Sequence, residues 1–275
     1  EAFKYAGITD QKFCPEPIAA AISYLHTRPR DEIQRVLTLD FGGGTLDFCI
    51  LDRGNPGFKV ISTHGIGLGG DHIDQLLYRH LLFPHLGKGK IWRRKGFDRE
   101  IETPFPFEDY EDLLLNWAVT YTLNQNRFTA PVMECIESAG EDAKCFVRLR
   151  DIIKHNLSYV LFTKIRDLKA ELSISDSAIL DLEEIDLRVE LTRAEFEAVI
   201  RKPLDQMTMA VDETLRKSRI DPSSIDVVLR TGGSSLIPAV KHILDQKFPG
   251  KVVDHDPFTS VAGGLAIASY EGLSF

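Results

Sequence analysis

VLTLDFGGGTLDFCIL, residues 36–51, is the stretch from which the rest of the chain can be interpreted. It contains two apolar runs of strand length, which are joined by Gly42, Gly43 and Gly44. Glycine tolerates positive φ angles and tight reversals, so the stretch predicts a β-hairpin. Asp40 lies where the first predicted strand ends, and Thr45 lies where the second begins.

The glycine turn is also a candidate phosphate site. Consecutive backbone amides without side chains form a concavity for anionic oxygens. Beside it, Thr45 offers a hydroxyl, and Asp40 offers a carboxylate that can order the waters of a bound Mg²⁺. A plain tight turn explains this stretch equally well when it is taken alone, because GGGTLD is neither a P-loop nor a dinucleotide-binding fingerprint.

Composition and charge exclude several classes of protein. The chain has 275 residues, 43% of them hydrophobic and 27% charged, which suits a globular protein of one large domain or two lobes. Its net charge of −8 disfavours nucleic acid as a main partner. No apolar run approaches the roughly 20 residues of a membrane span, and no signal peptide precedes Glu1, so we expect a cytoplasmic protein. The scattered cysteines predict neither a zinc site nor disulfides.

Two further stretches have the pattern of a ligand-binding corner. Residues 65–70, GIGLGG, end in Gly69 and Gly70, and Asp71 follows at the start of a predicted helix, which makes a second candidate anion site. Residues 227–234, VVLRTGGS, are a buried strand followed by a glycine turn at the start of another helix. Ligand sites form at the carboxyl ends of such strands, and the polar or glycine residues here are Gly232, Gly233 and Ser234.

Three other polar residues have both a structural and a functional interpretation. Glu16 lies between two prolines at a predicted helix start, where a carboxylate either favours the helix dipole or points rigidly into a cleft. Lys169 and Ser173 are four residues apart on a long predicted helix over 148–173, so they share one face. Taken alone, that spacing indicates a solvated face.

Six motifs in order give the chain a resemblance to a known family. PEPIAAA, LDFGGGTLDF, GLGGDHID, LKAELS, RTGGSSLIP and TSVAGGLAIA resemble the ATPase domain of the 70-kDa heat-shock proteins, the DnaK-type chaperones, and most closely their YegD-like relatives. The similarity covers nearly the whole chain. It implies an α/β fold of the actin-like ATPase (ribonuclease H-like) class, with an incomplete first lobe and most of the second lobe.

The resemblance implies a division of the chain into parts of those two lobes. We expect the following ranges: 1–30, the end of the first lobe; 31–70 and 204–258, the core of the second lobe; 71–203, its outer subdomain, with an insertion over 84–147; and 259–275, a helix that returns to the first lobe.

The resemblance also implies ATP or ADP with Mg²⁺ as ligands, and roles for the candidate residues. Asp40 and Glu16 correspond to carboxylates that hold the metal through water, and the Thr45 hydroxyl to one near the attacking water; these three are the expected catalytic residues. The expected nucleotide-binding residues are Gly42, Gly43, Gly44, Thr45, Gly69, Gly70, Asp71, Lys169, Ser173, Gly232, Gly233 and Ser234. With the resemblance, the functional interpretation of Lys169 and Ser173 is preferred.

The chain departs from the family pattern at the nucleoside site. The family's arginine that stacks on adenine corresponds to Ala170, and the arginine of its GGSTR motif to Leu236. These losses leave base affinity and base identity open. Asp71 stands where the family has glutamate.

We therefore expect part of the nucleotide-binding domain of a chaperone whose partners are unfolded client proteins and co-chaperones, without nucleic acid or membrane. The family's first phosphate hairpin has no counterpart in these 275 residues, so we expect a fragment that binds nucleotide weakly and hydrolyses it negligibly. Micromolar affinity for Mg-ATP in calorimetry would contradict this. Two alternatives stay open: a small-molecule (sugar) kinase of the same fold, and a non-catalytic interaction module with a decayed nucleotide site.

Overall fold

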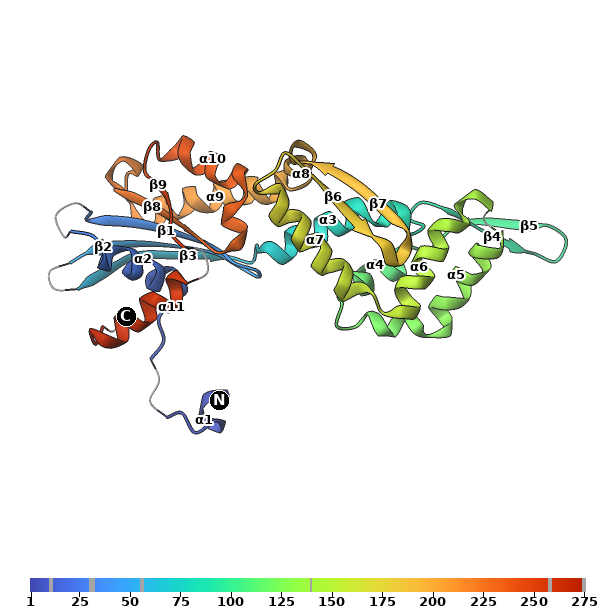
Figure 1. Ribbon diagram of the computed structural model, residues 1–275, viewed down its shortest axis with the longest axis horizontal. Coiled ribbons are helices and arrows are strands. Elements are labelled where there is room, and N and C mark those ends of the chain that lie inside the picture. Colours follow the sequence, from blue (N-terminus) through green and yellow to red (C-terminus); the bar gives the residue numbers. More distant parts are fainter. Residues whose placement is uncertain (10–11, 30–32, 55–56, 139, 257–258, 274–275) are drawn as a thin grey trace. The chain divides into compact units, whose positions relative to one another are not determined.

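A computed structural model of the protein describes residues 1–275 except 10–11, 30–32, 55–56, 139, 257–258 and 274–275 (Figure 1). The chain divides into two compact units, residues 1–72 together with 202–275, and residues 73–201. Among the described residues, no helix combines the length and the apolar character needed to cross a bilayer.

The first unit is built on a five-stranded mixed sheet. Its strands are β1 (Arg35–Phe41), β2 (Leu46–Arg53), β3 (Phe58–Ile66), β8 (Val227–Thr231) and β9 (Val252–Asp254), in the spatial order β3-β2-β1-β8-β9. β1, β2 and β3 pair antiparallel, whereas β8 lies parallel to both β1 and β9. The hairpin predicted over residues 36–51 is confirmed, because Asp40 pairs with Asp47 and Phe41 with Leu46.

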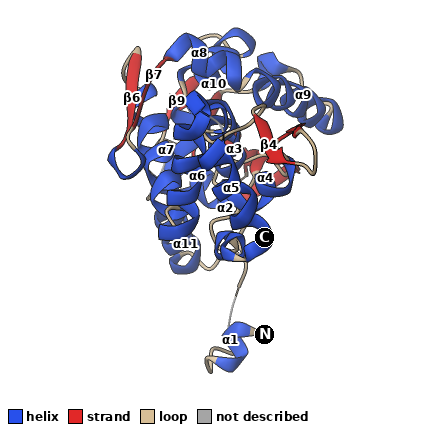
Figure 2. Cartoon of the chain, turned by 90° about the vertical axis from the view of Figure 1, so that its right-hand side faces the viewer, coloured by secondary structure: helices blue, strands red, loops and turns tan. Residues whose placement is uncertain are grey.

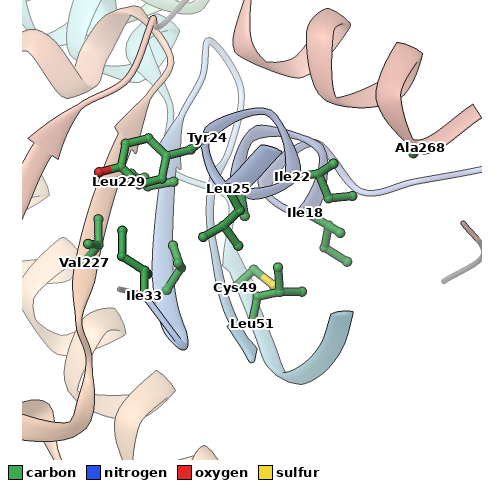
Figure 3. Close-up of a cluster of buried hydrophobic side chains, with 12 residues drawn as sticks. Ile18, Ile22, Tyr24, Leu25, Ile33, Cys49, Leu51, Val227, Leu229 and Ala268 are labelled. Atoms are coloured by element: carbon green, nitrogen blue, oxygen red, sulfur yellow. The ribbon is translucent and has the colours of Figure 1, made fainter. Parts of the chain in front are cut away.

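Helices complete the first unit. They are α1 (Ala2–Tyr5), α2 (Glu16–His26), the start of α3 (Gly70–Leu81), α9 (Arg201–Ser218), α10 (Pro238–Lys247) and α11 (Ser260–Tyr270). α2 buries Ile18, Ile22 and Leu25, which recur at helical spacing, against the side chains of the sheet (Figure 3). Cys49 of β2 belongs to this core.

α11 packs closely against α2. A Cβ atom at Gly264 would overlap the backbone carbonyl of Ala19, and one at Gly263 would lie 3.3 Å from Ser23 Oγ. The small residues of this helix therefore allow its close packing against α2.

The second unit is mainly helical. It contains β4 (Ile91–Lys95), β5 (Glu100–Pro104), α4 (Glu108–Leu114), the 3-10 helix η2 (Thr120–Asn124), α5 (Asn126–Ser138), α6 (Ala143–His155), α7 (Ser158–Leu172), β6 (Ser177–Leu182), β7 (Leu187–Thr192) and α8 (Arg193–Val199). β6 and β7 form an antiparallel hairpin next to α7 (Figure 2). A group of buried rings forms much of the core: Tyr78, Phe83, Phe105, Phe107, Tyr110 and Phe146.

The single long helix predicted over residues 148–173 is wrong. The chain forms two helices, α6 and α7, because Asn156 has a left-handed conformation with φ 51° and ends α6. The amides of Asn156 and Leu157 donate to the carbonyls of Ile153 and Ile152, which is a helix-ending pattern that asparagine tolerates. The apolar stripe continues across the break, so periodicity alone hid it.

Thr192 and Glu195 form a capping box at the start of α8. The Thr192 hydroxyl accepts from the Glu195 amide at 3.3 Å, and Glu195 Oε2 accepts from the Thr192 amide at 2.9 Å. We expect Thr192→Ala to lower the free energy of unfolding by about 1 kcal/mol in urea denaturation, because an amide at the start of α8 loses its partner. Thr163→Ala, an exposed threonine inside α7, is the control and should change stability by less than about 0.5 kcal/mol.

Candidate functional site

The glycine turn joins β1 to β2 and is exposed at its tip. Its ends are held together by a hydrogen bond from the Gly42 amide to the Thr45 carbonyl, 3.1 Å. The tight reversal is made without positive φ angles, since all three glycines are described and none has φ in the left-handed region. At Gly44, no atom lies within 4 Å of the position a Cβ would take. This part of the turn therefore borders open space.

The start of α3 is attached to the back of this turn. The amides of Gly70 and Asp71 donate to the carbonyls of Gly42 and Gly43 at 2.9 and 2.8 Å. A Cβ at Gly69 would overlap the Gly43 carbonyl oxygen. The second anion site expected at this helix start is thus not offered by these two amides, because both are used inside the protein. The glycines are needed for the close approach of two backbone segments.

Parallel pairing of β1 with β8 brings two predicted motifs together. Asp40 is the register partner of Thr231, and Gly232 follows directly. Gly232 has φ 78°, and a Cβ there would lie 2.5 Å from the Phe41 carbonyl oxygen and 2.7 Å from Asp40 Oδ1. Glycine is therefore required beside the Asp40 carboxylate, both for backbone conformation and for space.

Carboxylates gather around the turn. Asp40 is almost fully buried, and this burial, reinforced by the charges of Glu16 and Asp47 and opposed by the Thr231 hydroxyl, raises the pKa of Asp40 to about 6. Thr45 Oγ1 donates a hydrogen bond to Asp47 Oδ2 at 2.7 Å. A cavity of about 560 Å³ is lined by Glu16, Thr45 and Asp47, with Pro15, Pro17, Phe48, Thr63, His64 and Gly65.

These carboxylates suit a cation held through water better than one held directly. Among the described residues, no group of three or more histidine, cysteine or acidic side chains is placed to hold a metal ion. However, burial and neighbouring negative charge both disfavour the ionised form of Asp40, and a nearby cation would stabilise that ionised form. Mg²⁺ normally keeps several of its waters, so Asp40 and Glu16 fit a water-mediated site.

The turn after β8 is exposed at Gly233 and buried at Ser234. No atom lies within 4 Å of a Cβ position at Gly233, so its backbone borders open space. Leu236, which the resemblance matches to the arginine of the GGSTR motif, is 38% exposed.

Two residues of this unit were missed as site residues. The buried Arg230 guanidinium donates to the Ser235 carbonyl and, at 2.9 Å from Nε, to Asp254, so it fixes the Gly232–Gly233 turn. Its signal in the sequence is a single charge inside a buried strand, VVLRT. Asp47, which orients the Thr45 hydroxyl, has the signal of a second carboxylate beside the glycine turn.

Lys169 and Ser173 lie in the other unit. Lys169 Nζ is 2.6 Å from Asp74 Oδ1, and Arg166 Nε is 3.4 Å from Asp74 Oδ2. Burial raises the pKa of Asp74, and the two cations oppose this shift. The Ser173 hydroxyl donates to the Lys169 carbonyl at 3.1 Å, whereas Ala170 is exposed. Lys169 therefore has a structural role in this unit, as the main counter-charge of a buried acid.

The role of Lys169 can be tested by stability. We expect Lys169→Met to lower the free energy of unfolding by about 1–2 kcal/mol, because the buried Asp74 loses its nearest charged partner. Arg166→Met should cost less than about 0.5 kcal/mol, since that side chain is half exposed and its bond is longer. Urea denaturation at pH 7.5 measures both. Equal losses in the two variants would contradict the assignment of Lys169 as the main partner.

Comparison with known proteins gives the relatives of this chain. A family model described as "Hsp70 protein" matches residues 1–95 and 143–270. The chain is 26% identical over 269 residues to the chaperone protein DnaK of Mycoplasmoides gallisepticum, covering 97% of this chain and 37% of that protein. The DnaK proteins of Mycoplasmopsis pulmonis and Prochlorococcus marinus are also 26% identical, over 96% of this chain and over 36% and 34% of their own lengths.

The chain thus spans little more than a third of the length of these curated relatives. The family model, in contrast, covers well over half of the chain, on both sides of residues 96–142. By that match the protein belongs to the Hsp70 family, and its expected fold class, the actin-like ATPase class of α/β proteins, is confirmed.

Proposed function

We propose that this chain supplies the second-lobe part of an Hsp70-type nucleotide-binding domain, and that the β1–β2 turn holds the β- and γ-phosphates of ATP or the β-phosphate of ADP. One observation carries the proposal: the Asp40 carboxylate, the glycine turn and the Gly232–Gly233 turn meet at the carboxyl ends of two parallel strands. Open α/β sheets bind their ligands at such ends.

In this proposal the two glycine turns bind different parts of the nucleotide. The exposed backbone at Gly43 and Gly44 donates to phosphate oxygens, and the backbone at Gly233 lies against the nucleoside. Gly69, Gly70 and Asp71 act from behind by fixing the turn. Lys169 and Ser173 lie in residues 71–203, which we assign to the outer subdomain, and they stay proposed as nucleoside-binding residues.

The acidic residues act through water. Bound Mg²⁺ would neutralise part of the phosphate charge. Asp40 and Glu16 would hold this ion by accepting hydrogen bonds from its waters, and Asp40 would have to be ionised to do so. Because the Thr45 hydroxyl donates a hydrogen bond to Asp47, its oxygen would stay available to accept a hydrogen bond from the attacking water. Positioning and charge stabilisation then supply most of the catalysis of ATP hydrolysis in the whole protein.

The wider assignments follow from family membership. We propose that the whole protein acts on unfolded client proteins together with co-chaperones and is cytoplasmic, with neither nucleic acid nor membranes as partners. A relationship to the YegD-like proteins in particular stays a prediction. So does the division into an end of the first lobe over 1–30, a second-lobe core over 31–70 and 204–258, and a returning helix over 259–275.

Nucleotide titration followed by backbone NMR tests the proposed function. Millimolar Mg-ADP should shift the amides of Gly43, Gly44 and Gly233, with a dissociation constant weaker than micromolar. These shifts should require Mg²⁺, and they should be absent in Asp40→Asn. AMP with Mg²⁺ should fail to shift the amides of Gly43 and Gly44. Shifts confined to other parts of the chain would overturn the proposed site.

A further inference from the structure

The unit of residues 73–201 contains a second cavity. Its volume is about 480 Å³, which is in the range of small-molecule sites. It is bordered by η2, α5 and α6, and the two helices contact each other along their lengths (Figure 1). None of its lining residues belongs to the nucleotide site proposed above.

This cavity depends on the segment that lies between the two matched parts of the family model. Residues 96–142 contain η2 and α5, whereas α6 starts at Ala143, the first residue of the second matched part. One wall of the cavity therefore comes from the insertion and the other from a family helix. Family membership does not imply a ligand for a cavity formed in this way.

The cavity has an apolar base. Val132 of α5 and Ile153 of α6 are almost completely buried. Met133 lies at the rim and is 42% exposed. A methionine thioether is flexible and polarisable, so it adapts to apolar ligands of different shape. An apolar ligand would cover Met133 and remove its exposed surface from water.

One wall of the cavity carries a positive charge. Arg150 and Lys154 are four residues apart on α6 and therefore lie on one face of that helix. Asp151 accepts from Arg150 at 2.7 Å and so offsets its charge. For Lys154, the described part of the chain contains no ion-pair or hydrogen-bond partner of its ammonium group. A net positive charge is thus left beside an apolar base, on a chain whose net charge is −8.

We propose that this cavity binds a small apolar monocarboxylic acid. Its hydrocarbon part covers Val132, Met133 and Ile153, and its carboxylate pairs with Lys154. The side chains of Asn124 and Thr129, which also line the cavity, supply further polar contacts for the carboxylate. Binding needs no nucleotide, so this inference and the proposed function can fail separately.

Calorimetric titration of the whole chain with three eight-carbon probes tests the proposal. Octanoate, below its micelle concentration, should bind at least about tenfold more tightly than 1-octanol, and octylamine should bind most weakly. Lys154→Met keeps most of the apolar stem and removes the charge, so octanoate affinity should fall about tenfold and octanol affinity should stay the same. The matched control is Lys164→Met, an exposed lysine on α7, which should leave both affinities unchanged.

A second variant locates the ligand. Met133→Glu places a carboxylate at the apolar rim and should abolish octanoate binding. Because Met133 is at the surface, the thermal unfolding temperature of this variant should stay within about 2 °C of that of the parent. Octanoate should also shift the Met133 methyl signal in NMR spectra. Equal affinity for octanoate and octanol, or octanoate binding that survives both Lys154→Met and Met133→Glu, would overturn the proposal.

Discussion

Gly264→Ala should destabilise the chain by about 3 kcal/mol or more, the largest loss that we expect from a single methyl group. The added Cβ would overlap the carbonyl of Ala19, which is backbone and cannot rotate away. α11 would have to move away from α2, and buried residues such as Ala268 would lose contacts. Urea denaturation followed by circular dichroism measures the free energy of unfolding.

The neighbouring glycine is the matched control. Gly263→Ala makes the same chemical change in the same helix, and its Cβ would meet only the hydroxyl of Ser23 at 3.3 Å. A serine side chain can rotate, and alanine is a better helix former than glycine by up to about 1 kcal/mol. We expect this variant to have nearly the stability of the parent. If both variants lose the same free energy, the close contact with Ala19 does not determine stability.

Asp40→Asn should stabilise the chain in the absence of metal and nucleotide, and should abolish Mg-nucleotide binding. Raising the pKa of this carboxyl from 3.8 to about 6 costs the folded protein about 3 kcal/mol above pH 6, at 1.36 kcal/mol for each pKa unit. Asparagine has the same shape and carries no charge, so most of this cost disappears. The expected gain at pH 7.5 is about 2–3 kcal/mol.

The stability difference between Asp40→Asn and the parent should depend on pH, and this dependence is a sharper test than the size of the difference. Since the folded state raises the pKa of Asp40, the folded state holds the proton more tightly than the unfolded state does. The proton on Asp40 therefore contributes its full stabilisation of the folded state below about pH 3.8. This stabilisation is lost as the pH rises to about 6. The stability difference between variant and parent should widen over that range and stay constant above it. A difference that is independent of pH between 4 and 7 would show that Asp40 is not the titrating group.

The local parts of the site could be predicted because neighbouring residues determine them. Two apolar runs with three glycines between them produce the β1–β2 hairpin, and its register then places Asp40 opposite Asp47. The capping box at Thr192 is local in the same sense. In each case the residues that decide the structure lie within about ten positions of one another.

Contacts between distant segments could not be predicted from these patterns. The helix start at Gly70 has the pattern of an anion site, but its amides donate hydrogen bonds to the carbonyls of Gly42 and Gly43. Lys169 has the spacing of a solvated or ligand-binding residue, but it pairs with the buried Asp74 on another helix. The partner that satisfies a polar group is selected by packing, and no periodicity encodes it.

By itself, the sequence determined the β1–β2 hairpin, the order of the motifs and the family that they indicate, since these depend on residue type and short spacing. Only the tertiary structure decided that Gly232 must be glycine beside Asp40, that Arg230 fixes the following turn, and that an insertion makes a charged apolar cavity with α6. The physical reason is that burial, steric overlap and charge pairing depend on which segments are in contact. Strand pairing and helix packing determine those contacts.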